Sequence, residues 1–249
     1  MSQNLAQTRQ ITTNFPINEN LYQNCEEEIT ENYFPETVII DGEEMGETTV
    51  HYGLISNFVK MLELFFVTRR DVLISANLNV YYDEENGRKF YAPDILVCFG
   101  IGNHPRKTFK LWDEGTFPQI IFEIASASTV EADLGKKYLD YANLGVEEYY
   151  LLDAERENLP APLIAYHRQN GRLVSAKIEN NRVFSPLLNL EIVDENDRFR
   201  LFDVAAKEFL KTPLELEYDY ERLEMEKESL ESENAELKAR LAKYENGEL

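Results

Sequence analysis

The sequence is poor in the residues that build thiol or imidazole sites. It contains 2 cysteines and 3 histidines among 249 residues. Cys25 lies in a polar stretch, whereas Cys98 lies in an apolar run that is typical of a buried strand. We therefore expect neither a disulfide nor a cysteine-based metal site. Reduced thiols of this kind fit a cytoplasmic protein.

Long apolar runs are also missing. No stretch of about 18 apolar residues occurs, so no transmembrane helix is expected. The first residues, MSQNLAQTRQITTNFP, lack the apolar region of a secretory signal. Hydrophobic residues nevertheless make up 43% of the chain and aromatic residues 12%. This composition is that of a globular protein with a sizeable core, and it excludes a largely disordered chain.

Positively charged residues are few, and the excess of acidic residues differs between parts of the chain. Lysine and arginine total 25 against 46 acidic residues, which gives a formal net charge of −21. The net charge is −9 over residues 1–50, −5 over residues 51–211 and −7 over residues 212–249. No basic stripe appears, so tight non-specific binding to DNA phosphates is not expected. The two acidic ends also allow another function, an acidic mimic that inhibits a DNA-binding protein.

Hydrophobic patterning divides the chain into three parts. Residues 1–35 are polar and acidic and are expected to form a flexible segment. Residues 36–211 alternate between strand-like and helix-like patterns, which predicts one mixed α/β domain. Residues 212–249 form a separate helix beyond Pro213.

The elements of the middle part follow from periodicity and turn signals. Strands are expected at 38–40, 72–82, about 89–99, 120–125, 148–153 and 199–202, with a hairpin of 163–168 and 172–178. Helices are expected at about 47–68, 131–144 and 203–210. The first helix has Thr48 or Thr49 as its cap. Its predicted buried stripe is Val50, Leu54, Phe58, Met61, Leu62 and Phe65.

The C-terminal helix carries a heptad pattern. Leu223, Leu230 and Leu237 recur every seven residues, with Tyr244 next in line. The companion positions are Tyr220, Lys227, Asn234 and Leu241. Leucine at one seam and a single asparagine at the other is typical of a parallel two-stranded coiled coil. The pattern predicts a homodimer, and a single solvated helix is the alternative.

Two carboxylates stand where ionised groups are costly. Asp94 follows Pro93 at the start of an apolar strand, and Glu123 interrupts the apolar run 120–125. A buried carboxylate needs a partner, a metal ion or a shifted pKa. Two of them on neighbouring strands can share a divalent cation through oxygen ligands, and the carbonyl of Ile124 is a further candidate ligand.

Charged residues on two helices are candidates to complete such a site. Asp133 and Lys137 are four apart, so they share a helix face, and Lys136 lies beside them. A lysine aimed at the metal would orient a water and stabilise charge on a phosphate. The same spacing also fits an exposed salt bridge. Glu47 and His51 form another four-spaced pair, for which a surface role is the alternative.

Several segments of the chain resemble those of a known protein family. The resemblance covers about residues 36–210. The stretch Gly46-Glu47-Thr48 with His51 belongs to it, as does KLWDEG at 110–115. The main segments are YAPDILV at 91–97, IFEIAS at 121–126, Ser128-Thr129, DLGKK at 133–137, Tyr141 and GVEEYY at 145–150. Together these segments resemble the Uma-type family of putative restriction endonucleases, a branch of the PD-(D/E)XK nuclease superfamily.

The resemblance implies a mixed β-sheet flanked by helices, a restriction-endonuclease-like core with a Mg²⁺ or Mn²⁺ site. Asp94 matches the aspartate of the superfamily motif, and Glu123 matches its second acid. The motif lysine would stand two residues later, where this chain has Ala125. Lys137 matches a lysine usual in the family, and some superfamily members carry their lysine on a nearby helix. Glu47 matches an acid of the first helix that often completes the metal shell.

Two functions therefore compete besides the mimic. The first is a metal-dependent endonuclease that hydrolyses DNA phosphodiester bonds. The second is a nuclease fold with little or no catalysis, which acts as a dimeric binding or scaffold module through its coiled coil. Ala125 and the acidic surface favour the second function, whereas the paired carboxylates and Lys137 favour the first.

Overall fold

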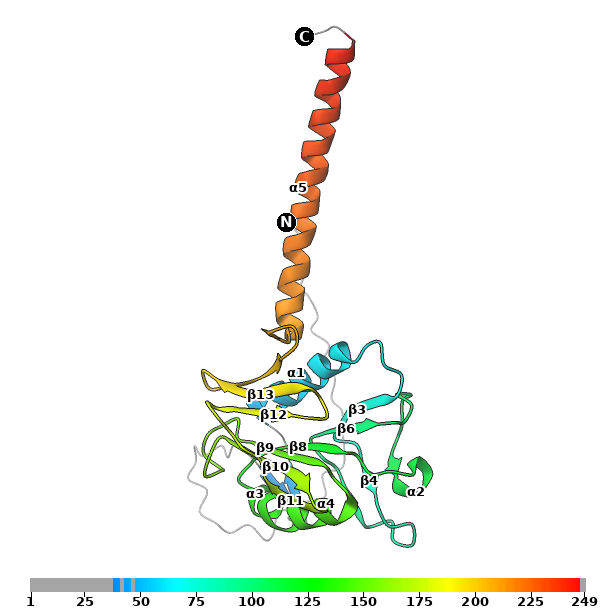
Figure 1. The fold of residues 1–249 in the computed structure, drawn as a ribbon, viewed down its shortest axis with the longest axis vertical. Helices are drawn as coiled ribbons and strands as arrows, with labels where there is room; N and C mark the ends of the chain where they lie inside the picture. The colour runs from blue at the N-terminus through cyan, green and yellow to red at the C-terminus, as the bar shows by residue number, and fades with distance from the viewer. Residues whose placement is uncertain (1–37, 41–42, 46–47, 247–249) are drawn as a thin grey trace, which may run out of the picture.

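The computed structural model describes residues 38–40, 43–45 and 48–246 of the chain. The predicted flexible segment 1–35 and Glu47 lie outside these residues. The part described is a mixed α/β body from which one long helix extends, as Figure 1 shows. In this part no helix is both long and apolar enough to span a lipid bilayer.

The body is built on a six-stranded sheet with the order β11-β10-β9-β8-β6-β3. Only β8 and β9 are parallel, and every other neighbouring pair is antiparallel. Four predicted strands and the predicted hairpin lie in this sheet. Their bounds are β3 (Val72–Ala76), β6 (Ile95–Phe99), β8 (Ile120–Ile124), β9 (Glu148–Leu152), β10 (Leu163–Gln169) and β11 (Arg172–Ser175).

Both faces of this sheet are buried, which explains why its central strands are apolar apart from the buried acids Glu123 and Glu148. Alternate residues of β8 enter different cores: Phe122 packs on one side and Ile121 on the other. The Phe122 side is covered by helix α1 (Thr49–Phe65) and a second sheet. The Ile121 side is covered by Tyr141 and neighbouring residues of the helix that joins β8 to β9.

Thr48 caps helix α1, as predicted, because its hydroxyl accepts a hydrogen bond from the amide of His51 at 3.2 Å. Phe58, Met61 and Leu62 lie in the core, as the helical spacing predicts. Val50 does not, because its side chain is 53% exposed at the start of the helix.

The connection between β8 and β9 has three parts: α3 (Val130–Ala132), the π-helical turn η2 (Asp133–Lys137) and α4 (Tyr138–Leu144). It corresponds to the predicted helix 131–144. Gly145 ends it with a φ of 94°, a left-handed conformation that glycine adopts without strain. Because β8 and β9 are parallel, the chain must cross one face of the sheet between them. This crossing places η2 near the end of β8.

Two predicted strands are interrupted. The run 72–82 divides into β3 and β4 (Val80–Tyr81), because Asn77 turns the chain with a φ of 50°. The run 89–99 divides into β5 (Phe90–Tyr91) and β6. A small separate sheet has the order β5-β4-β7, in which β7 (Phe109–Lys110) precedes the short helix α2 (Leu111–Glu114).

The predicted helix 203–210 is wrong. The chain makes a turn there, with Lys207 at a φ of 61°, and then enters strand β15. The strand predicted at 199–202 belongs to a four-stranded sheet whose other three strands the sequence patterns did not indicate. Its order is β12 (Arg182–Ser185), β13 (Leu190–Glu195), β14 (Arg198–Asp203) and β15 (Glu208–Phe209). A further pair, β1 (Val38–Ile40) and β2 (Glu43–Met45), is antiparallel.

A buried polar cluster joins this second sheet to the central one. Glu148 of β9 accepts hydrogen bonds from Tyr150, the Ser185 hydroxyl and the Leu187 amide. The Tyr150 hydroxyl also lies 3.1 Å from Nε2 of His167. Burial lowers the pKa of His167 below its ordinary value of 6.5, although the charge of Glu148 opposes the shift.

We expect this histidine to weaken the fold at acidic pH. Below pH 6.5 the unfolded chain binds a proton that the folded chain resists, so stability is complete above that value and declines as pH falls through it. Replacing His167 with glutamine should reduce the loss of unfolding free energy between about pH 7.5 and pH 5.5. Urea denaturation of the wild type and of this variant at both pH values measures the loss of unfolding free energy. His104→Gln, an exposed control, should leave the loss unchanged, and an equal loss in all three proteins would contradict the assignment.

Candidate metal and active site

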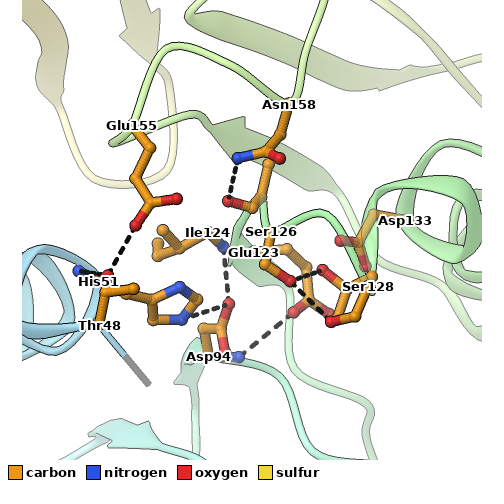
Figure 2. A network of polar contacts seen from close by, with 12 residues as sticks. Thr48, His51, Asp94, Glu123, Ile124, Ser126, Ser128, Asp133, Glu155 and Asn158 are labelled. Carbon is orange, nitrogen blue, oxygen red and sulfur yellow. Dashed lines mark hydrogen bonds and ion pairs between the residues drawn. The ribbon is translucent and has the colours of Figure 1, made fainter. Parts of the chain in front are cut away.

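Asp94 and Glu123 meet where the ladder between β6 and β8 ends. Its last recorded pair is Ile95 with Phe122, so each acid lies one residue beyond it. The Ile124 amide donates to Oδ2 of Asp94 at 2.6 Å, and the Asp94 amide lies 3.4 Å from Oε2 of Glu123. Figure 2 shows this reciprocal arrangement. Each carboxylate is thus held by the main chain of the other strand.

Glu123 is almost fully buried, with an exposed fraction of 2%. The hydroxyl of Tyr141 donates to Oε1 at 2.7 Å, and Nζ of Lys137 lies 3.1 Å from the same oxygen. Burial raises the pKa of Glu123 to about 8, against the opposing positive charge of Lys137. Asp94 and Asp133 add to the rise. A second cation beside Glu123 would therefore relieve an unfavourable concentration of negative charge.

The Asp133–Lys137 pair belongs to this site and is not a surface salt bridge. Nζ of Lys137 lies 2.7 Å from Oδ1 of Asp133, whose side chain is 1% exposed. Burial raises the pKa of Asp133, opposed by Lys137 and by the Thr129 hydroxyl. Burial alone would lower the pKa of Lys137, but the charges of Glu123 and Asp133 outweigh it and raise that pKa. Lys137 is thus a cation held between two acids.

The other predicted candidates lie in different places. Lys136 points away from the acids, with a side chain 68% exposed and paired with Asp140 at 2.8 Å. His51 reaches the site, since its Nε2 lies 3.7 Å from Oδ2 of Asp94. Next to it the Thr48 hydroxyl donates to Oε1 of Glu155 at 2.8 Å, as Figure 2 shows. Glu47 lies outside the described residues.

Ala125 occupies the strand position of the superfamily lysine. It is 2% exposed, and its amide donates to the carbonyl of Leu152 in β9. A methyl group cannot supply positive charge there. The positive charge next to Glu123 comes instead from Lys137, which lies on the helix that joins β8 to β9.

The sequence reasoning assigned no role to Tyr141, although its hydroxyl contacts Glu123. One signal could have suggested it: Tyr141 lies four residues after Lys137, so both project from the same face of one helix. A tyrosine without a polar partner is costly to bury fully. Glu155 carried no comparable signal, because it lies in the loop after β9.

The donor atoms suit a hard divalent cation. Carboxylate and carbonyl oxygens are the ligands that Mg²⁺ and Mn²⁺ prefer. Along a strand, successive residues direct their main-chain groups to opposite edges. The Ala125 amide points to β9, so the Ile124 carbonyl faces the Asp94 edge together with the Ile124 amide. Among residues 38–40, 43–45 and 48–246, however, no three His, Cys, Asp or Glu side chains form a metal-binding group.

Comparison with known proteins identifies the family of this chain. No curated protein matches the sequence. The crystal structure of a putative nuclease belonging to DUF820 from Anabaena variabilis ATCC 29413 is 17% identical, with a TM-score of 0.43. The match covers 60% of this chain and 80% of that one. The family model Uma2, described as "Putative restriction endonuclease", matches residues 32–193, well over half of the sequence. The chain therefore belongs to the Uma2 family.

Proposed function

We propose that this protein is a metal-dependent endonuclease that hydrolyses DNA phosphodiester bonds. Asp94, Glu123 and the carbonyl of Ile124 would hold Mg²⁺ or Mn²⁺, and Glu47 would assist. The observation that carries the proposal is the convergence of two acids and Lys137 from three separate elements. A cytoplasmic location belongs to the proposal, and the free thiol of buried Cys98 supports it.

The charge of the site supports metal dependence. When all three are ionised, Asp94, Glu123 and Asp133 carry three negative charges, and Lys137 carries one positive charge. A phosphate diester approaching such a site meets net negative charge and is repelled. A bound divalent cation would cancel that charge, lower the pKa of a water and stabilise charge on the phosphate.

The side chains have separate tasks in this mechanism. Asp94 and Glu123 would hold the cation, and the Tyr141 hydroxyl holds the Glu123 carboxylate in one orientation. An ammonium group has three donors. Two of those on Lys137 face Asp133 and Glu123, which leaves a third for the attacking water or a phosphate oxygen. Asp133 keeps Lys137 extended toward the phosphate.

Plasmid nicking tests the proposed function. The purified full chain should convert supercoiled DNA to the nicked form with Mg²⁺ or Mn²⁺ and should stop when EDTA is added. Asp94→Ala removes one of two acidic ligands and should abolish nicking. Equal activity in the two proteins would assign the cleavage to a contaminant and remove the proposal. A protein that binds DNA but never cleaves it would favour the scaffold function.

The C-terminal helix supports a further proposal, a parallel homodimer. Helix α5 (Pro213–Glu245) begins with a capping box, in which the Glu215 amide donates to the Thr212 hydroxyl and the Thr212 amide donates to Glu215. Arg200 of β14 also binds Glu215, at 3.0 Å, so the base of α5 is tied to the body. The predicted seam residues Tyr220, Leu223, Leu230, Leu237 and Leu241 are more than half exposed. Such a row of exposed apolar side chains is typical of a surface that packs against another protein chain.

A matched pair of variants tests the dimer. Leu230→Glu places a charge in the seam and should convert the dimer to a monomer. Met225→Glu adds the same charge outside the seam, where Met225 is 71% exposed, and should leave the dimer intact. Sedimentation equilibrium of both proteins measures the mass. A wild-type monomer would refute the coiled coil, and a dimer in both variants would move the interface into the body.

A further inference from the structure

A surface groove lies beside the helix that joins β8 to β9, outside the acidic site. Its volume is about 560 Å³. The turn between β4 and β5 forms one wall, and η2 with α4 forms the other. The lining residues are Tyr82, Arg88, Lys89, Phe90, Lys136, Asp140, Asn143 and Leu144. We call this hollow the basic groove, because its lining holds three cations, Arg88, Lys89 and Lys136, and one acid, Asp140, while Asp83 pairs with Lys89.

A short wall of aromatic rings separates the basic groove from Glu123. Nζ of Lys136 lies 4.8 Å from the centroid of the Tyr91 ring. The Tyr91 ring meets that of Tyr141 at 5.2 Å, edge to face, and the Tyr141 hydroxyl binds Glu123. The groove and the acids thus lie on the two sides of one tyrosine pair. Two ring contacts and one hydrogen bond therefore connect Lys136 with Glu123.

The groove residues are accessible and suited to phosphate. The side chains of Lys89 and Lys136 are 51% and 68% exposed. Asp83 binds Lys89 at 2.7 Å, and Asp140 binds Lys136, so both ammonium groups are held in place with donors to spare. Arg88 has no ion-pair partner anywhere in the described part of the chain. Its guanidinium is therefore available for a bidentate phosphate contact.

An exposed aromatic ring completes the chemistry. Phe90 is 40% exposed at the groove and packs against Tyr81, with ring centroids 5.2 Å apart. Cations along a groove together with an exposed ring are the combination by which proteins hold single nucleic acid strands. An acidic peptide would use the cations but would gain nothing from stacking on Phe90.

We propose that the basic groove binds the nucleic acid strand that flanks the scissile phosphate, with Arg88, Lys89 and Lys136 on its phosphates and Phe90 against a base. The proposal rests on the nuclease function proposed above, because it adds the contacts that guide the strand into the acidic site. It would also allow a protein of strongly negative net charge to bind DNA.

Binding without cleavage tests the groove. The full chain is titrated into a fluorescein-labelled oligonucleotide, single-stranded and then duplex, in EDTA, and anisotropy is recorded over a range of salt. Arg88→Ala with Lys89→Ala should weaken binding about tenfold and make the salt dependence shallower by about two released ions. Phe90→Leu should weaken single-strand binding and leave the salt dependence unchanged.

The control pair removes the same charge elsewhere. Lys60→Ala with Arg70→Ala, at exposed positions on and after α1, should bind like the wild type. Unchanged affinity in the Arg88/Lys89 variant would overturn the proposal, as would binding of poly-glutamate but not of DNA. A plasmid-nicking series separates the two proposals. If the wild type cleaves and the groove variant keeps its KM, the groove fails and the nuclease stands. If the wild type never cleaves but the groove variant loses DNA binding, the nuclease fails and the groove stands.

Discussion

Replacing Lys137 with methionine is expected to lower the rate of plasmid nicking about 10²- to 10³-fold, the usual effect of removing one group that stabilises transition-state charge. Methionine has a similar length, so the helix and its packing should be preserved. Asp94 and Glu123 are untouched, and Mn²⁺ should still bind. Calorimetry and nicking on the same preparation therefore separate a catalytic role from metal binding.

A second lysine provides the control. Lys60 lies on α1, where its ammonium group pairs with Glu63 at 2.9 Å, and its side chain is 55% exposed. Lys60→Met should nick DNA at the wild-type rate. If Lys137→Met does so too, the lysine serves only to balance the buried acids, and the proposed orientation of the water is wrong.

Glu123→Gln is expected to weaken Mn²⁺ binding by at least about 100-fold, since even a residue that only supports a metal ligand contributes up to this factor. The amide keeps the shape of the carboxyl group and can still accept the hydrogen bond from Tyr141. Lys137 retains Asp133 as a partner, so the fold should survive. Nicking should disappear together with the metal.

Glu131→Gln is the matched control, because Glu131 is an exposed acid on α3 near the same helix. It should bind Mn²⁺ as the wild type does. If Glu123→Gln also binds with wild-type affinity, the cation lies elsewhere. If the wild type shows no binding either, the nuclease fold of this chain carries no metal.

The parts of the fold that the sequence predicts are those with strong local signals. The runs 120–124 and 148–152 are apolar apart from Glu123 and Glu148, and both form buried strands. Asn170-Gly171 supplies the positive φ values of a tight hairpin, with φ of 49° and 78°. Thr48 caps α1 as its side-chain chemistry favours. Each of these features depends on a few adjacent residues.

The errors arise where distant contacts override local preference. The segment after Asp203 contains Val204, Ala205 and Ala206, a composition that favours a helix. The Asp203 carboxylate instead accepts hydrogen bonds from the amides of Ala205 and Ala206 and closes a turn. Phe209 then packs against Phe202, with ring centroids 5.2 Å apart, and strand pairing prevails. No single-sequence pattern contains that pairing.

The sequence predicts only part of the candidate site, because contacts between distant segments place the rest. Asp94 and Glu123 stand out in the sequence because charge is costly on apolar strands. The sequence does not reveal that Lys137 points toward these acids, because its spacing from Asp133 fits an exposed surface pair equally well. Only the parallel crossover from β8 to β9 turns this face of the helix toward Glu123. That arrangement depends on the path of the whole chain.

Anomalous diffraction from crystals soaked in Mn²⁺ tests the central claim most directly, because it locates the ion without reference to activity. We predict one strong peak between the carboxylates of Asp94 and Glu123, within about 2.3 Å of an oxygen of each, and its loss in Glu123→Gln. A peak at another place, or none in crystals that hold Mn²⁺ in the surrounding liquid, would contradict the assignment of these two acids as a metal pair.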